Sequence, residues 1–326
     1  MLESDIKRLN VRIAGLNMKT PVTTGSGTFG FGLEFEDFLD LNAIGAICVK
    51  GTSLKASSGN PGVRIAETPS GLLNSIGLEN PGVDWFLRET LPKLRRFEAP
   101  VIVNIYAHSV EDFARLAEKL NVEGVSALEI NISCPNVREG GLAFGVDPEM
   151  ASGVVRAVKE ASEKTVITKL TPNVTDVTEI ALAVDTAGTD AISMINTLLG
   201  MKIDIRRKKP VLGNIKGGLS GPAIRPVALR QVYDVAQCVS VPIIGMGGIV
   251  TAEDAVEFLL AGASAVAVGT ANFMDPGTAE TISEGLIAYL DKNRFSSIEE
   301  IVGLALPEGK DSMPYYKKKR NVQNGF

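Results

Sequence analysis

The stretch ALEINISCPN, residues 127–136, places polar groups at the end of an apolar segment. Apolar residues alternate along its first part, as they do in a buried strand. Asn131 would then lie at the mouth of a strand, with Cys134 just beyond it on a loop that Pro135 stiffens. A cysteine and asparagines at such a place could simply fill space and form a turn. A functional site is favoured, because seven other predicted strands end in the same kind of polar or glycine-rich segment.

The elements that must position these residues are eight short apolar runs, separated by segments with helical spacing. The predicted strands are residues 21–24, 44–49, 101–105, 127–131, 166–170, 191–195, 241–245 and 265–268. Strands that are apolar on both faces and alternate with helices are typical of a parallel sheet. We therefore predict an α/β fold, a parallel (β/α)8 TIM barrel that spans residues 1–326 as a single domain. A doubly wound open sheet is the alternative, but no GxGxxG motif opens a helix after the first strand.

In such a barrel the carboxyl ends of the strands meet at one mouth, where chemistry gathers. Lys50 and Lys169 each directly follow an apolar run, although a single lysine there is more often a surface charge. Two buried ammonium groups without anionic partners would cost several kcal/mol. The two lysines therefore predict a bound anion or an electron-rich ring.

Glycine-rich turns follow the last two predicted strands, in IIGMGGI (243–249) and AVAVGTANF (265–273). Barrels commonly bind phosphate at this place with main-chain N–H groups. Such glycines can also make plain tight turns. Paired after strands seven and eight, they favour a phosphate.

Two connections are too long for plain turns, residues 51–83 and residues 200–222. We expect both to reach over the barrel mouth as long loops that act as lids or binding surfaces. Disorder is the competing interpretation for residues 205–210, which include four consecutive basic residues. His108 is more simply a loop residue than a general base, Cys48 and Cys238 more simply packing groups, and the YYKKKR tail (315–320) a solvated terminus.

Composition limits the partners and the compartment. The chain has 33 basic and 38 acidic residues, a net charge of −5, so no basic field would attract nucleic acid or anionic lipid. Three cysteines and one histidine cannot supply a zinc or iron–sulfur site within this chain. The charged first residues argue against a signal peptide, and no segment offers the roughly 18 uninterrupted apolar residues of a membrane span. We expect a cytoplasmic protein whose partners are small molecules and other proteins.

Motifs along nearly the whole chain resemble those of class 1 dihydroorotate dehydrogenases. They occur in the family's order and include SGTFGFG (26–32), ETPSGLLNSIGLENPG (67–82), INISCPN (130–136), TKLTPN (168–173), SMINT (193–197), GGLSGPAIRPVAL (217–229), GMGGI (245–249) and VGTA (268–271). Several are too long for coincidence. Gly25 is one small departure, since alanine is expected there. The chain looks most like the class 1B catalytic subunit.

The resemblance implies an FMN across the barrel mouth, with its phosphate on the loops after strands seven and eight. The residues it implies as FMN contacts are Ser26, Lys50, Gly51, Asn104, Asn131, Lys169, Ile195, Gly221, Gly247, Gly248, Gly269 and Thr270. Those it implies for dihydroorotate or orotate are Lys50, Asn74, Ser75, Ile76, Gly77, Leu78, Asn131, Asn136, Asn196 and Thr197. Cys134 would be the catalytic base, with Lys50 as a second catalytic residue.

These residue types suit the implied reaction, the oxidation of (S)-dihydroorotate to orotate in de novo pyrimidine (UMP) biosynthesis. Dihydroorotate loses a proton from C5 and a hydride from C6, so the site needs one base and a cation beside the flavin. Cys134 suits the first role, and Lys50 or Lys169 the second. Asparagines can bind both the donors and the acceptors of orotate without adding negative charge.

The class 1B subunit works, in that family, with a second subunit that carries FAD and a [2Fe–2S] cluster and passes electrons to NAD. The resemblance thus implies a homodimer that joins an electron-transfer subunit in a heterotetramer. A fumarate-reducing class 1A enzyme and a dihydropyrimidine dehydrogenase-like enzyme are the alternatives, while class 2 is disfavoured because it uses serine as the base. From the residues alone, an aldolase or isomerase with a Schiff base at Lys169, or an assembly subunit, stays open.

Overall fold

The computed structural model describes residues 3–133 and 144–323, with side chains described as far as residue 318. Its centre is an eight-stranded parallel sheet with the strand order β3-β16-β15-β10-β9-β8-β7-β4. The strands are β3 (Val22–Thr24), β4 (Ile47–Thr52), β7 (Val101–Ile105), β8 (Ala127–Asn131), β9 (Thr165–Lys169), β10 (Ala191–Met194), β15 (Ile243–Met246) and β16 (Ala265–Val268). Almost all their side chains are buried, which explains why these strands are apolar on both faces.

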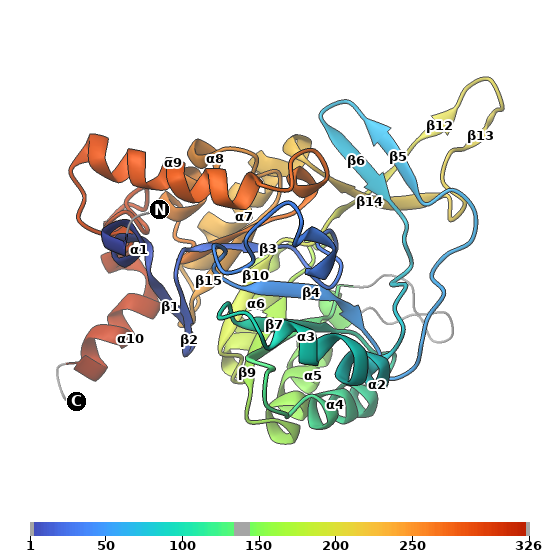
Figure 1. The fold of residues 1–326 in the computed structure, drawn as a ribbon, viewed down its shortest axis with the longest axis horizontal. Helices are drawn as coiled ribbons and strands as arrows, with labels where there is room; N and C mark the ends of the chain where they lie inside the picture. The colour runs from blue at the N-terminus through green and yellow to red at the C-terminus, as the bar shows by residue number, and fades with distance from the viewer. Residues whose placement is uncertain (1–2, 134–143, 324–326) are drawn as a thin grey trace.

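Contacts between the first and last strands of this sheet nearly close it into a barrel. The N–H of Gly45 donates to the carbonyl of Val22 at 2.7 Å, and the Thr23 hydroxyl donates to the carbonyl of Ala46 at 2.7 Å. β3 and β4 therefore lie side by side (Figure 1). The predicted (β/α)8 barrel is confirmed.

Helices follow the strands and surround the barrel (Figure 1). They are α4 (Val110–Lys119), α5 (Pro148–Ala161), α6 (Val177–Thr186), α7 (Arg225–Ala236), α8 (Ala252–Leu260) and α9 (Thr278–Asn293). The side chains of Ser109, Asp147 and Asp176 cap α4, α5 and α6, and Thr251 forms a capping box with Asp254 at α8. Each cap satisfies backbone N–H groups that a helix leaves unpaired, and so fixes where the helix starts.

The other helical segments are short or lie near the chain ends: α1 (Glu3–Leu9), η1 (Leu33–Phe35), α2 (Val83–Trp85), the π-helix η2 (Phe86–Thr90), α3 (Leu91–Leu94), η3 (Phe144–Val146), η4 (Pro222–Ile224), η5 (Thr270–Phe273), η6 (Ile298–Glu300), η7 (Gly309–Ser312) and α10 (Pro314–Gln323). The hairpin β1 (Val11–Ile13) and β2 (Leu16–Met18) contacts the amino end of β9, where the Thr165 hydroxyl donates to the carbonyl of Ala14 at 2.9 Å. The expectation of a solvated tail was wrong at Tyr316, which α10 buries, whereas Lys317 and Lys318 are exposed as expected. No helix in residues 3–133 and 144–323 is long and apolar enough to cross a membrane.

The two long connections meet in a second sheet. This small sheet has the antiparallel order β11-β14-β6-β5, formed by β5 (Ile65–Thr68), β6 (Gly71–Asn74), β11 (Leu198–Met201) and β14 (Lys216–Ser220). Gly218 pairs with Asn74 in its centre. A further hairpin, β12 (Ile203–Asp204) and β13 (Lys209–Pro210), takes the place of the loop for which disorder was considered. In Figure 1 the small sheet stands beside the barrel at the upper right, far from both chain ends.

The predicted strand limits agree with the structure to within two residues except at β4. The strands at residues 101–105, 127–131 and 265–268 coincide with β7, β8 and β16. The strand predicted at residues 44–49 instead runs from Ile47 to Thr52, so Lys50 and Gly51 lie within it. An irregularity in the pairing with β7, between Val49 and Thr52, explains the difference. Bulges of this kind are common next to active sites, where they redirect side chains.

Candidate active site

A layer of polar side chains lies inside the barrel. Five neighbouring strands, β4, β7, β8, β9 and β10, contribute Cys48, Asn104, Glu129, Lys169 and Ser193 respectively. All five side chains are almost completely buried. Asn104 is in register with Glu129, and Lys169 with Ser193, so these side chains lie next to each other across the sheet.

The Glu129 carboxylate is at the centre of this layer. Its Oε1 accepts a hydrogen bond from Asn104 Nδ2 at 2.6 Å and lies 3.6 Å from both Lys169 Nζ and Cys48 Sγ. Its Oε2 accepts from the Ser193 hydroxyl at 2.7 Å. The buried charge of Glu129 is therefore paired and hydrogen-bonded, as a stable barrel interior requires.

Burial and charge act on the two acids of this layer in opposite ways. Burial alone would raise the pKa of Glu129, but the Lys169 ammonium and the hydrogen bonds from Ser193 and Asn104 hold this pKa below its ordinary value. Burial raises the pKa of the Cys48 thiol well above its ordinary value, and the neighbouring Glu129 carboxylate raises it further. Glu129 is therefore ionised and Cys48 is a neutral thiol at pH 7, which agrees with the prediction that Cys48 is not reactive.

Lys50 and Lys169 are not two buried lysines without anionic partners, as the sequence had suggested. Lys169 is buried, but Glu129 is its anionic partner, and its Nζ also donates to the Ser26 hydroxyl at 3.1 Å. Lys50 is only half-buried, with its Nζ 5.9 Å from the centre of the Phe31 ring. Neither lysine by itself requires a bound anion. Both lysines are still candidates for the site, because both lie near the carboxyl ends of strands.

Residues predicted to contact the substrate come from both the barrel and the small sheet. Asn196 Nδ2 donates to Asn131 Oδ1 at 3.4 Å. From the small sheet, Asn74 Nδ2 donates to the carbonyl of Gly218 at 3.3 Å, and an added Cβ at Gly218 would lie 2.0 Å from the hydroxyl of Thr197. Asn131 is thus hydrogen-bonded to Asn196, and Asn74 is connected to Thr197 through Gly218.

The segment from Asn74 to Leu78 continues from the small sheet toward the barrel. Ser75 is buried, while Ile76, Gly77 and Leu78 are half-buried. An added Cβ at Gly51 would lie 3.4 Å from Leu78 Cδ2 and 3.2 Å from Asn104 Oδ1. Leu78 therefore borders the polar layer. Cys134 and Asn136 lie outside the described residues.

The glycine turns after β15 and β16 also lie beside other predicted site residues. An added Cβ at Gly247 would lie 3.5 Å from Ile195 Cγ1. An added Cβ at Gly248 would lie 2.7 Å from the Gly221 carbonyl oxygen. In the turn after β16, the Thr270 hydroxyl donates to the Ser220 hydroxyl at 2.7 Å, and Gly269 lies against Gly25. The two turns therefore meet the end of β10, the start of η4 and the loop after β3.

Comparison with known proteins decides between the readings that the residues alone left open. The family model for dihydroorotate dehydrogenase matches residues 8–290. The chain belongs to the dihydroorotate dehydrogenase family. It is therefore an oxidoreductase, and its barrel is not that of an aldolase or of a mere assembly subunit.

Curated relatives in this family match over nearly their full lengths. Dihydroorotate dehydrogenase B (NAD(+)), catalytic subunit, of Geotalea uraniireducens is 56% identical over 296 residues, which cover 90% of this chain and 97% of the relative. Proteins of the same name from Geobacter sulfurreducens and Bacteroides thetaiotaomicron are 53% and 52% identical. Each alignment covers 90% of this chain, and 97% and 98% of the two relatives respectively.

The dihydroorotate dehydrogenase family implies FMN, and the described site fits this cofactor. An added Cβ at Gly269 would meet no atom within 4 Å, so the backbone there borders open space. The other glycine turn, at Gly247 and Gly248, is half-buried and brings a second stretch of backbone without a Cβ, of the kind that binds phosphate. Lys169 and Asn104 offer an ammonium group and an amide from the barrel interior, which suits the polar edge of a flavin.

The glycine at position 248 is required by the backbone, and its replacement gives a first prediction. Gly248 has a φ of +75°, and an added Cβ would lie 2.7 Å from the Gly221 carbonyl. We expect Gly248→Ala to lower the free energy of unfolding by about 1–3 kcal/mol. Gly153→Ala is the matched control, because it lies within α5, where an added Cβ meets no atom within 4 Å. It should stabilise by about 0.5–1 kcal/mol. Urea denaturation of both variants measures the difference, and equal effects would contradict the assignment.

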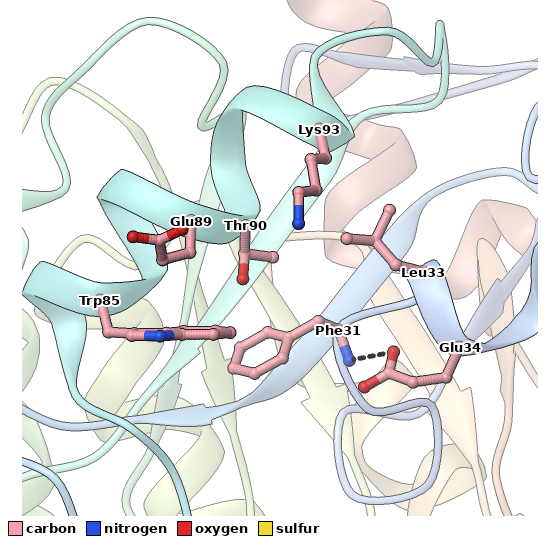
Figure 2. Close-up of a pocket in the computed structure, with 7 residues that line it drawn as sticks. All are labelled: Phe31, Leu33, Glu34, Trp85, Glu89, Thr90 and Lys93. Atoms are coloured by element: carbon pink, nitrogen blue, oxygen red, sulfur yellow. Dashed lines mark hydrogen bonds between the residues drawn. The ribbon is translucent and has the colours of Figure 1, made fainter.

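A surface cleft separate from the polar layer lies between the loop after β3 and the helical run α2–η2–α3 (Figure 2). It is lined by Phe31, Leu33, Glu34, Trp85, Glu89, Thr90 and Lys93. The Phe31 ring lies 5.7 Å from the Trp85 ring and also under Lys50. Because none of the predicted site residues lines this cleft, we do not assign the reaction to it. Its Phe31 ring is also the one that lies beneath the Lys50 ammonium.

Sequence reasoning missed Glu129 and Ser193, although a signal for Glu129 was present. Leu128 and Ile130 alternate as strand residues, so Glu129 must share its face of β8 with Asn131. A carboxylate on the same face as a predicted site residue is a candidate for the site. His108 is exposed and in contact with Tyr106, as expected of a loop residue.

Proposed function

We propose that this chain oxidises (S)-dihydroorotate to orotate with FMN, as a step of de novo pyrimidine biosynthesis. The observation that carries the proposal is the meeting of three groups around one barrel mouth: the Asn131–Asn196 pair, the buried Lys169, and the backbone turns at Gly248 and Gly269. The turns suit a phosphate, and the amides suit the donors and acceptors of a pyrimidine ring. This proposal takes residues 1–326 as a single FMN-binding domain.

Each site residue has a proposed role in this reaction. FMN would be held by Ser26, Lys50, Gly51, Asn104, Asn131, Lys169, Ile195, Gly221, Gly247, Gly248, Gly269 and Thr270. The substrate would be held by Lys50, the segment from Asn74 to Leu78, Asn131, Asn136, Asn196 and Thr197. When bound, FMN supplies the acceptor for the hydride from C6. Cys134 takes the proton from C5, and the Lys50 ammonium stabilises negative charge beside the ring.

The colour of the purified chain tests the proposal directly. The chain should be yellow with bound FMN, and dihydroorotate should bleach that colour without oxygen. A chain that binds no FMN, or one whose flavin dihydroorotate does not reduce, would contradict the proposed function. Orotate should also bind more tightly than uracil, and the reverse order would favour a dihydropyrimidine dehydrogenase-like enzyme.

The rate of this bleaching should depend on pH. A free thiol has a pKa near ~8.5, and only the thiolate accepts a proton. We expect the reduction rate to rise between pH 6 and pH 9 in stopped-flow measurements with the same dihydroorotate concentration. A rate that stays flat across this range would remove the thiol from the role of base.

We also propose that a partner chain carries the electrons onward to NAD, through FAD and a [2Fe–2S] cluster on that partner. The relatives are named catalytic subunits and carry NAD(+) in their names, which supports the proposal. Among the described residues, no group of three or more His, Cys, Asp or Glu side chains could hold a metal ion. Turnover with NAD should therefore need the partner chain. Turnover of the isolated chain with fumarate would instead favour a class 1A enzyme.

A homodimer, as the core of the heterotetramer, is supported by apolar side chains on the small sheet and on the β12–β13 hairpin that joins its strands β11 and β14. Exposed apolar residues gather there, from β5, β11, β12 and the adjoining loops: Val63, Ile65, Leu199, Met201, Ile203, Ile205 and Ile215. Ile205 is 83% exposed. Such a group of exposed apolar side chains is typical of a surface that another chain covers. We propose that a second copy of this chain covers it.

Substitution on this surface tests the homodimer. We expect Ile203→Glu to raise the dissociation constant of the dimer at least tenfold, about 1.4 kcal/mol, because it buries an unpaired carboxylate. Leu182→Glu is the control, since Leu182 is exposed on α6, away from the small sheet. Sedimentation velocity at several concentrations measures both constants. An unchanged constant for Ile203→Glu, or an equal effect of Leu182→Glu, would exclude this surface.

A further inference from the structure

Glu129 is a buried charge to which the proposed reaction gives no role. It neither accepts the substrate proton nor belongs to the predicted contacts of FMN. Yet two of its polar neighbours, Asn104 and Lys169, are proposed to hold the cofactor. A buried carboxylate costs much free energy to retain, even when it is paired.

We infer that Glu129 is a positioning residue that holds Lys169 and Asn104 in place, sets the net charge where these two residues would hold the flavin, and through this charge sets the reduction potential. This inference rests on the proposed function, because it concerns bound FMN. In this role Glu129 acts on the cofactor only through its neighbouring side chains.

The geometry supports the positioning part. Oε1 of Glu129 accepts from Asn104 Nδ2 at 2.6 Å and lies 3.6 Å from Lys169 Nζ, so one oxygen orients two proposed cofactor contacts. Ser193 holds the other oxygen at 2.7 Å, which fixes the plane of the carboxylate. Lys169 Nζ is then directed to the Ser26 hydroxyl at 3.1 Å, another proposed FMN contact.

Charge supports the second part. The Lys169 side chain is 7% exposed and the Glu129 side chain is 4% exposed, so water screens neither charge well. The pair has a net charge near zero. Reduced flavin holds more negative charge than oxidised flavin, so an uncompensated Lys169 would favour the reduced form. Glu129 therefore lowers the reduction potential and keeps electrons able to leave toward the acceptor.

The test compares reduction potentials of the FMN-loaded full chain, measured by equilibration with a dye of known potential. Glu129→Gln keeps the size and removes the charge; its amide oxygen can still accept from Asn104, and its amide nitrogen can donate to the Ser193 hydroxyl. We expect it to increase the affinity for reduced FMN over oxidised FMN at least tenfold, which raises a two-electron potential by about 30 mV. Glu129→Asp, which keeps the charge, should stay closer to the wild-type value.

Ser193→Ala is the matched control, because it removes a hydrogen bond to the same carboxylate and leaves the charge unchanged. It should change the affinity ratio less than twofold. A change of less than twofold in Glu129→Gln, or an equal change in Ser193→Ala, would overturn the inference. If Glu129→Gln does not fold, Glu129→Asp and Ser193→Ala decide. Both keep the negative charge, so the inference predicts that neither raises the reduction potential by about 30 mV. It fails if either variant does. A wild-type chain that binds no FMN would refute the proposed function instead.

Discussion

Cys134→Ala should retain its FMN and reduce it roughly 10² to 10⁴ times more slowly with dihydroorotate, because it lacks the positioned base. The residue just before Cys134 in the sequence supports this expectation. Ser133, the last described residue before Cys134, donates through its hydroxyl to the carbonyl of Lys169 at 3.0 Å. Its N–H donates to Asn131 Oδ1 at 3.2 Å. The backbone is thus tied to the ends of β8 and β9 one residue before the thiol.

Stopped-flow bleaching of the flavin measures this effect, and the other cysteines provide the control. Cys238 is partly buried at the end of α7, and burial with the nearby Asp185 carboxylate raises its pKa to about 11. Cys238→Ala should therefore leave the reduction rate unchanged. Unchanged bleaching in Cys134→Ala would exclude the thiol as the base. Loss of FMN from that variant would point to a structural role instead.

The second large effect is expected from Lys169→Met, which leaves the Glu129 carboxylate buried without its cation. Breaking a buried ion pair by removing one partner costs about 3–5 kcal/mol. We expect a loss of this size in the free energy of unfolding, measured by urea denaturation of the FMN-stripped chain. Stripping matters because bound FMN would add its own stabilisation.

The pH dependence of this loss follows from the pKa of Glu129. In the wild-type chain this pKa is lowered, so its stabilisation is present above the ordinary value of 4.5 and is lost as the pH falls through the lower folded value. Without Lys169 we expect burial to outweigh the remaining hydrogen bonds and to raise this pKa, so that the carboxylate destabilises most at high pH. The deficit of Lys169→Met should therefore shrink between pH 7 and pH 5.

The double variant Lys169→Met with Glu129→Gln separates charge from packing. It removes both charges and should recover most of the lost stability. A double variant as unstable as Lys169→Met would mean that the loss comes from the shape of the lysine side chain. A Lys169→Met deficit that does not depend on pH would lead to the same conclusion.

The barrel could be predicted because its strands are buried on both faces. β16 is a continuous apolar run, and β7 and β8 are apolar apart from Asn104, Glu129 and Asn131. The limits of all three strands coincide with the prediction. β4 was displaced because no local pattern signals the irregularity between Val49 and Thr52. The small sheet was missed as a sheet because strands such as GLLN and KGGLS are short and rich in glycine, and its pairing joins distant parts of the chain.

The candidate site was predicted in part for the same reasons. The ends of parallel strands must converge, so Asn104, Asn131 and Lys169 could be grouped without coordinates. The partner of Lys169 could not be found by counting residues after strand ends, because Glu129 lies two positions before the end of β8. Spatial pairing across strands, rather than order along one strand, decides which charges neutralise each other.

The pairing of β6 with β14 limits how early during synthesis the small sheet can fold. Asn74 and Gly218 are 144 positions apart, so a ribosome must release more than half of the barrel before these two strands can meet. The strand β6 with its neighbour β5 therefore waits as an isolated hairpin during synthesis, and such hairpins are marginal in water. The residues from Asn74 to Leu78 consequently gain their final support only late in biogenesis.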